Sequence, residues 1–106
     1  MTGFRTLAAA IAALLAFGTP AEAQRHRPFI QLFQAGGFGG RSLWLTSSVS
    51  DLRWYNFNNR AASARVSGRW RLCDRPHFRG HCTTISSNRS SLPMRGRVQS
   101  VRFISW

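Results

Sequence analysis

The sequence predicts an all-β protein, a sandwich of about eight short antiparallel strands built from two copies of one unit. Three observations support this prediction. Apolar and polar residues alternate in short runs, as they do in strands that bury one face. The same series of segments recurs after about forty residues. No stretch of the chain shows sustained helical periodicity.

Each copy contains the same elements in the same order. An alternating strand leads into a turn that contains glycine, at residues 35–40 in the first copy and 75–80 in the second. A second strand, a serine-rich loop and a final alternating strand complete each copy, which spans residues 28–67 or 68–106. The expected strands are residues 30–34, 42–45 and 62–66 in the first copy, and residues 70–74, 82–85 and 99–103 in the second.

Alternation along each strand divides the side chains between a buried face and an outer face. Neither copy is able to bury its apolar face alone, so we expect the two copies to close over one shared core. The residues expected in this core are Ile30, Leu32, Leu43, Leu45, Ala64, Val66, Trp70, Leu72, Ile85, Val101 and Phe103.

The N-terminal residues 1–23 have the pattern of a secretory signal peptide, and we expect the folded domain to comprise residues 24–106. The uncharged apolar run Leu7–Phe17 is followed by the small residues Ala21 and Ala23, which suit signal-peptide cleavage after Ala23. The alternative, a membrane anchor, needs roughly 20 apolar residues, and this run is shorter. We therefore expect a periplasmic or secreted protein without a transmembrane segment after cleavage.

Export would place the two cysteines of the chain in an oxidising compartment, where an even count favours a disulfide. Cys73 occupies an outward position of its strand, and Cys82 lies on the same face of the next strand. We therefore expect these two residues to pair, which would add roughly 2–3 kcal/mol of stability to a small domain. The alternative is a zinc site in which His77 and His81 join both cysteines as ligands.

The two turns share a spaced pattern of an aromatic residue, a second aromatic and a glycine, with a serine later in each copy. The residues of this pattern are Phe33, Phe38, Gly40 and Ser63 in the first copy, and Phe78, Gly80 and Ser100 in the second. The pattern resembles the signature of the βγ-crystallin Greek key. The resemblance implies that the aromatics clasp a folded hairpin, that glycine adopts a positive φ, and that a serine late in the motif bonds the hairpin. Cys73 stands in place of the first aromatic of the second copy, so a disulfide would replace that clasp. The resemblance makes residues 28–67 the first Greek key and residues 68–106 the second.

The resemblance also implies a question about calcium, because many microbial members of the family bind it in a segment that reads N/D-N/D-x-x-S/T-S. Asn58, Asn59 and Ser63 match this pattern, but Ala62 replaces the expected hydroxyl residue. The second segment, residues 95–100, keeps only its final serine. Calcium prefers six to eight oxygen ligands, usually including carboxylates, and arginines crowd both segments. We expect no required cofactor and at most a weak, degenerate calcium site.

Catalytic motifs are not apparent, and we expect no enzyme activity. The two carboxylates of the expected domain, Asp51 and Asp74, lie in different copies and read as turn residues. The glycines of residues 36–40 lack the Lys-Ser/Thr and the helix that follow a phosphate-binding loop. No serine stands in a nucleophile-elbow pattern.

Charge is the other distinctive feature, because the chain has 15 basic residues, all of them arginine, against 3 acidic residues, and a formal charge of +12. Arginines interleaved with aromatics are typical of surfaces that bind polyanions. The candidates for such binding are Arg65, Arg69, Arg71 and Arg102, at outward strand positions. An anionic lipid, an acidic polysaccharide or another extracellular polyanion is the expected partner. The alternative is that the charge serves only solubility or reflects coding bias.

Together these features predict a non-enzymatic, exported structural or binding protein that is strongly basic. A second function remains open, in which the protein is a secreted protease inhibitor of crystallin-like fold. Residues 75–79 would then present arginine on a rigid loop to a trypsin-like pocket.

Overall fold

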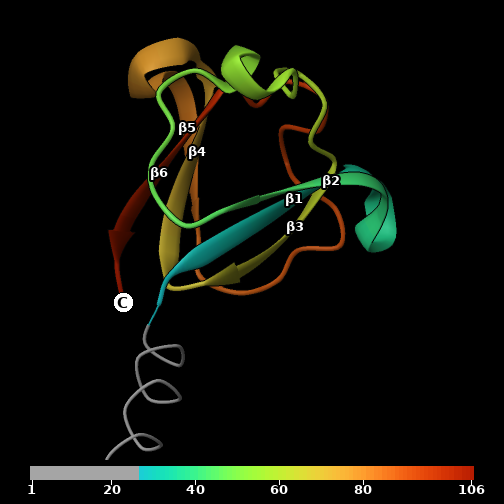
Figure 1. Ribbon diagram of the computed structural model, residues 1–106, viewed down its shortest axis with the longest axis horizontal. Helices are drawn as coiled ribbons and strands as arrows, with labels where there is room; N and C mark the ends of the chain where they lie inside the picture. Colours follow the sequence, from blue (N-terminus) through green and yellow to red (C-terminus); the bar gives the residue numbers. More distant parts are fainter. Residues whose placement is uncertain (1–26) are drawn as a thin grey trace, which may run out of the picture.

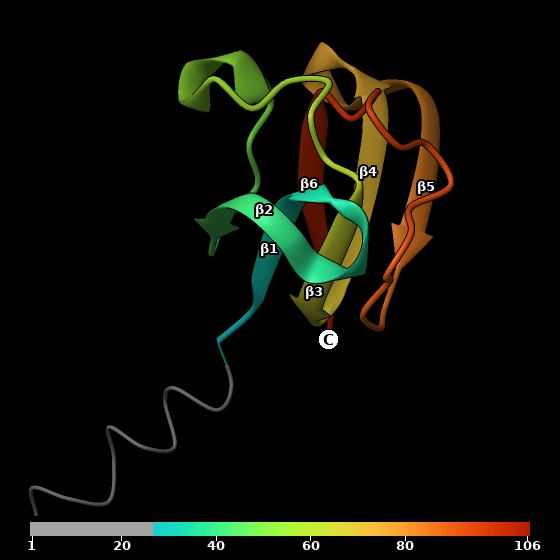
Figure 2. The same cartoon turned by 90° about the vertical axis from the view of Figure 1, so that its right-hand side faces the viewer.

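The computed structural model describes residues 27–106, which form two three-stranded antiparallel sheets. Figures 1 and 2 show β1, β2 and β3 grouped in one sheet and β4, β5 and β6 in the other. The strand orders are β2-β1-β3 and β5-β4-β6, so the two halves of the chain have the same topology. The strands are β1 (Phe29–Ala35), β2 (Gly39–Leu45), β3 (Ser63–Ser67), β4 (Arg69–Arg75), β5 (Arg79–Ile85) and β6 (Ser100–Ser105).

The predicted repeat and the all-β fold class are therefore confirmed. The signal peptide expected at residues 1–23 lies outside the described residues. Within residues 27–106, no helix has the length and apolar character needed to cross a membrane.

The number of strands differs from the prediction, because the structure has six strands and not eight. The serine-rich loop of each half contributes only a single bridging residue, which pairs with the sheet of the other half. Val49 bridges to Val101 in β6, and Arg89 bridges to Ala64 in β3. A single bridge is too short to count as a strand, so neither loop forms one. Each loop nevertheless adds one paired residue to the edge of a sheet.

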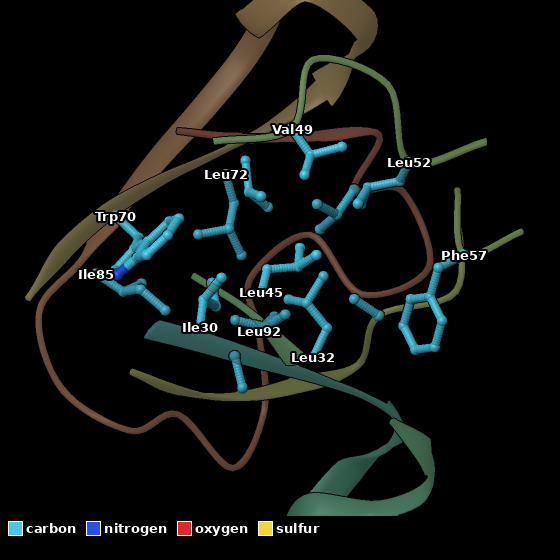
Figure 3. Close-up of a cluster of buried hydrophobic side chains, with 14 of the residues drawn as sticks. Ile30, Leu32, Leu45, Val49, Leu52, Phe57, Trp70, Leu72, Ile85 and Leu92 are labelled. Carbon is cyan, nitrogen blue, oxygen red and sulfur yellow. The ribbon is translucent and has the colours of Figure 1, made fainter. Parts of the chain in front are cut away.

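The core lies between the two sheets, and Figure 3 shows its side chains converging from both halves of the molecule. Of the predicted core residues, Leu43, Val66 and Phe103 are only partly buried at its edge, and the others are buried. The core also contains loop residues, which strand alternation did not predict. These additional members are Val49, Leu52, Phe57, Ala61, Leu92, Met94 and Val98.

Three short 3-10 helices connect the strands, namely η1 (Gly36–Phe38), η2 (Leu52–Tyr55) and η3 (Pro76–Phe78). η1 and η3 are the folded hairpins that follow the first strand of each half. In both, two successive residues adopt left-handed backbone conformations: Gly37 and Phe38 in η1, and His77 and Phe78 in η3. η2 and η3 lie at the same end of the molecule (Figures 1 and 2), where the His77 amide donates to the Ser50 carbonyl.

Candidate functional site

The first hairpin is held as the sequence pattern predicted. The rings of Phe33 and Phe38 meet edge to face, with centroids 5.8 Å apart. The buried Ser63 hydroxyl donates to the Ala35 carbonyl at 2.6 Å and accepts from the Phe38 amide at 3.0 Å. Gly40 has a φ of 75°, a conformation that disfavours residues with a Cβ.

The second hairpin uses the same serine but a different clasp. The Ser100 hydroxyl donates to the Arg75 carbonyl at 2.7 Å and accepts from the Phe78 amide at 3.1 Å. A disulfide joins Cys73 to Cys82 across β4 and β5, which confirms the predicted pairing. Cys73 is fully buried but lies outside the core cluster, in agreement with its predicted outward position.

The disulfide occupies both sulfur atoms, so the four ligands of the alternative zinc site are not available together. Within residues 27–106, no group of three or more histidine, cysteine, aspartate or glutamate side chains is arranged to hold a metal ion. The Asp74 carboxylate accepts from the His81 amide at 2.9 Å, as a residue that stabilises a turn does.

Asp51 has a similar local role at the start of η2. Its carboxylate caps η2 by accepting from the Arg53 amide at 3.0 Å, and it pairs with the Arg53 guanidinium at 2.7 Å. These side-chain and backbone hydrogen bonds lower the pKa of Asp51 below its ordinary value. Asp51 and Asp74 thus each accept a hydrogen bond from a backbone amide of their own half.

The predicted arginine candidates divide between the two sheets. Three of them, Arg69, Arg71 and Arg102, are exposed at outward positions of β4 and β6. We call these three residues the arginine face. Arg71 lies directly opposite Arg102 in the β4–β6 register. The guanidinium carbon of Arg102 is 5.4 Å from the centroid of the Phe78 ring, so this residue also covers the second hairpin.

The fourth candidate, Arg65, lies on the other sheet, where it has a structural contact that the sequence did not reveal. Its guanidinium carbon is 4.3 Å from the centroid of the Phe38 ring, close enough for a cation–π interaction. Arg65 in β3 lies opposite the neutral residue Gln31 in β1. In the second sheet, by contrast, Arg102 in β6 lies opposite a second arginine, Arg71 in β4. Clustered positive charge on an outer sheet surface is therefore a feature of the second sheet.

The two segments with the calcium pattern lie side by side, as their backbone hydrogen bonds show. The Asn59 amide donates to the Val98 carbonyl, and the Gly96 amide donates to the Ala61 carbonyl, each at 2.9 Å. Beside them lies an open hollow of about 590 Å³, bordered on its other side by residues of β1 and β2 next to the first hairpin. The residues that line this hollow are Gln34, Ala35, Gly40, Asn59, Arg60, Ala62, Arg95 and Gly96.

This set of residues does not fit a calcium ion. The hollow contains no carboxylate, and Arg60 and Arg95 bring two positive charges to it. Ala62 offers no hydroxyl group, and Ser63 is buried and bonded to the first hairpin. Calcium prefers several hard, anionic oxygens, so the predicted set of Asn58, Asn59 and Ser63 is a poor set of ligands.

The sequence pointed to the arginines near the calcium pattern but not to the hollow. Its wall joins residues from β1, β2 and two separate loops, and this juxtaposition exists only in the folded chain. The signal that could have indicated it was the presence of Arg60 and Arg95 at segments where calcium would require acidic or neutral side chains.

The fold and the two hairpin clasps define a domain of two Greek keys closed over one core. Residues 29–104 match the Beta/Gamma crystallin family, and the chain belongs to it.

Solved structures of the family resemble the chain over most of the described residues. A βγ-crystallin from Ciona intestinalis is 30% identical with a TM-score of 0.69, covering 72% of this chain and 99% of that one. A βγ-crystallin from an archaeon is 25% identical with a TM-score of 0.64, covering 74% and 100%. The fifth crystallin domain of the non-lens protein Absent in melanoma 1 is 29% identical with a TM-score of 0.63, covering 74% and 89%. No curated protein matches the chain by sequence.

Proposed function

We propose that this βγ-crystallin domain is an exported, non-enzymatic protein that binds polyanions of the cell envelope or the extracellular space through its arginine face. The observation that carries the proposal is the cross-strand pair of Arg71 and Arg102. Like charges directly opposite each other in a sheet are destabilising. A bound anion would relieve this repulsion by lying between the two guanidinium groups.

The surroundings of the arginine face support this role. Arg69 adds a third guanidinium two residues before Arg71 on the same strand. Within residues 27–106, the acidic side chains do not neutralise the face, because Asp51 pairs with Arg53 and Asp74 bonds the His81 amide. The guanidinium groups thus present their donors to an external ligand with repeated negative charge, such as an acidic polysaccharide or an anionic lipid surface.

Salt dependence of binding tests the proposal on residues 24–106. Wild-type protein is expected to bind heparin and vesicles of anionic lipid, and binding should weaken steeply as salt is added. In the double variant Arg69→Gln/Arg71→Gln, we expect elution from heparin at lower salt and a salt slope reduced by about one per arginine.

The matched control is Arg89→Gln/Arg97→Gln, which removes the same charge from exposed positions outside the arginine face. If the two double variants lose affinity equally, net charge alone accounts for binding and the proposal is wrong. Arg102 is left unchanged in these variants because it also packs on Phe78.

The alternative function of protease inhibition has no support in the loop geometry. Residues 76–78 of the candidate loop form η3 and do not extend away from the domain. The Arg75 carbonyl accepts a hydrogen bond from the Ser100 hydroxyl, and His77 has a left-handed backbone conformation. A protease site would need an extended, accessible segment here, so we expect no inhibition of trypsin by micromolar protein in a standard peptide-hydrolysis assay.

A further inference from the structure

The hollow beside the calcium-pattern segments has an unusual combination of size and charge. It is an open depression with a volume of about 590 Å³, which leaves room for a small anion. Its two charged lining residues are Arg60, from the first Greek key, and Arg95, from the second. We propose that this hollow binds a phosphate group, so that the place of the calcium pattern has become an anion site in this chain.

Arg95 is exposed, but its guanidinium has a defined neighbour. Its guanidinium lies against the first hairpin, with Nη2 about 3.5 Å from the place where a Cβ on Gly36 would stand. The Arg95 guanidinium therefore packs against the backbone of the first hairpin. The backbone near Arg95 is also fixed, because the Gly96 amide donates to the Ala61 carbonyl.

The chemistry of the lining favours an oxyanion. Guanidinium groups match the paired oxygens of phosphate with two parallel hydrogen bonds. The side-chain amides of Asn59 and Gln34, which also line the hollow, are able to donate further hydrogen bonds. None of the lining residues is acidic, so no negatively charged side chain in the wall repels an anion.

This hollow is separate from the arginine face. The hollow is lined by residues of β1, β2 and the loops, whereas the arginine face lies on β4 and β6. A polyanion would engage the face through several charges in a row, whereas the hollow would take one phosphate group. The inference therefore does not depend on the proposed function.

Titration of residues 24–106 with inorganic phosphate, followed by calorimetry and by amide chemical shifts, tests the inference. We expect saturable binding with shifts at Asn59, Arg60 and Gly96. The double variant Arg60→Gln/Arg95→Gln should bind phosphate roughly tenfold more weakly or worse, since charge-assisted hydrogen bonds are lost. The variant Arg89→Gln/Arg97→Gln loses the same charge outside both the hollow and the arginine face, and it should bind phosphate as tightly as the wild type.

Two further measurements complete the design. Arg95→Lys keeps the charge but removes the planar fork, and we expect it to weaken phosphate binding while leaving the melting temperature unchanged. A parallel titration with glycerol 3-phosphate identifies the source of the group, because tighter binding of the ester indicates a phosphate carried by a larger molecule, and tighter binding of inorganic phosphate indicates the free ion.

Absence of saturable phosphate binding by the wild type would overturn the inference. So would equal weakening in both double variants, which would indicate a general effect of net charge. A result in which phosphate binding fails while heparin binding depends on Arg69 and Arg71 would reject the hollow and retain the arginine face.

Discussion

At the scale of single residues, Ser63 and Ser100 do the same work in the two Greek keys. Each hydroxyl joins both ends of a folded hairpin, by donating to a carbonyl before the turn and accepting from an amide within it. Both side chains are fully buried, so water is not available to replace them. The resemblance to the βγ-crystallin signature implied this role for each serine.

Replacement of either serine by alanine is therefore expected to lower stability. Ser63→Ala and Ser100→Ala should each cost about 1–3 kcal/mol, because a hairpin amide and a hairpin carbonyl both lose the hydroxyl that bonds them. Thermal unfolding should show a fall of roughly 4–8 °C per kcal/mol for a domain of this size. Ser47→Ala, at an exposed position, is the control and should leave the melting temperature unchanged. An equal effect of all three substitutions would contradict the clasp.

Asp51 gives the domain a predictable dependence on pH. The pKa of this carboxyl is lowered by its hydrogen bonds to Arg53, so the folded state favours the charged form. The resulting stability is fully present above the unfolded pKa of about 4, and it is lost as the pH falls through the lowered folded value.

Asp51→Asn is accordingly expected to be less stable than wild type at pH 7, with the difference shrinking as the pH is lowered below about 4. Urea unfolding of both proteins at several pH values measures it. Arg53→Gln should give the same pattern, because it removes the partner of the same carboxylate. A difference that stays constant down to the lowest pH would show that the ion pair has no part in stability.

At the scale of elements, the strands were predictable because one buried face imposes alternation on the sequence. The observed bounds of β1, β3, β4 and β6 differ from the predicted ones by no more than two residues. β2 and β5 begin three residues earlier than predicted, at Gly39 and Arg79. These extra residues lie beyond a register shift after Phe33 or Cys73, and they are glycines or exposed polar residues, which carry no alternating signal.

The glycines of the hairpins differ in how strictly they are required, which gives an element-scale prediction. Gly37 and Gly80 both have a positive φ, but a Cβ at Gly37 would meet nothing within 4 Å, whereas one at Gly80 would collide with the Asp74 carboxylate. Gly37→Ala should therefore cost only about 1–2 kcal/mol, from backbone strain.

Gly80→Ala should cost clearly more, because Asp74 must also move and give up its bond to the His81 amide. Denaturant midpoints of the two variants, with wild type alongside, provide the comparison. Similar losses in the two variants would show that backbone conformation, rather than packing against Asp74, sets the requirement for glycine.

At the scale of the whole molecule, the sandwich followed from the repeat, but the grouping of charge did not. Outward strand positions identified the arginine candidates, yet strand alternation does not say which sheet a residue joins, so Arg65 separated from the other three only in the fold. The hollow could not be predicted at all, because its lining comes from segments that are distant in sequence. Core residues of the loops were missed for the same reason, since irregular segments have no periodic pattern.

The charge of the whole domain and the lining of the hollow together predict a weak response to calcium. A micromolar site would stabilise the folded state by about 4 kcal/mol in about 1 mM calcium. We expect no such increase, because Arg60 and Arg95 line the place of the calcium pattern. Melting curves with calcium and with a chelator, monitored by tryptophan fluorescence, make the comparison; a rise of many degrees in calcium would refute this expectation.

The exchange of bridging residues between the halves has a consequence for how the domain assembles. Val49 of the first half completes the sheet of the second, and Arg89 of the second completes the sheet of the first. Neither half therefore has a finished structure until its counterpart is present, and separately expressed halves should stay unfolded until mixed. Folding must wait for contacts between distant parts of the chain, which makes it slow but all-or-none. Once the domain has folded, we expect neither half to unfold without the other, so a protease would find no locally unfolded half to cleave.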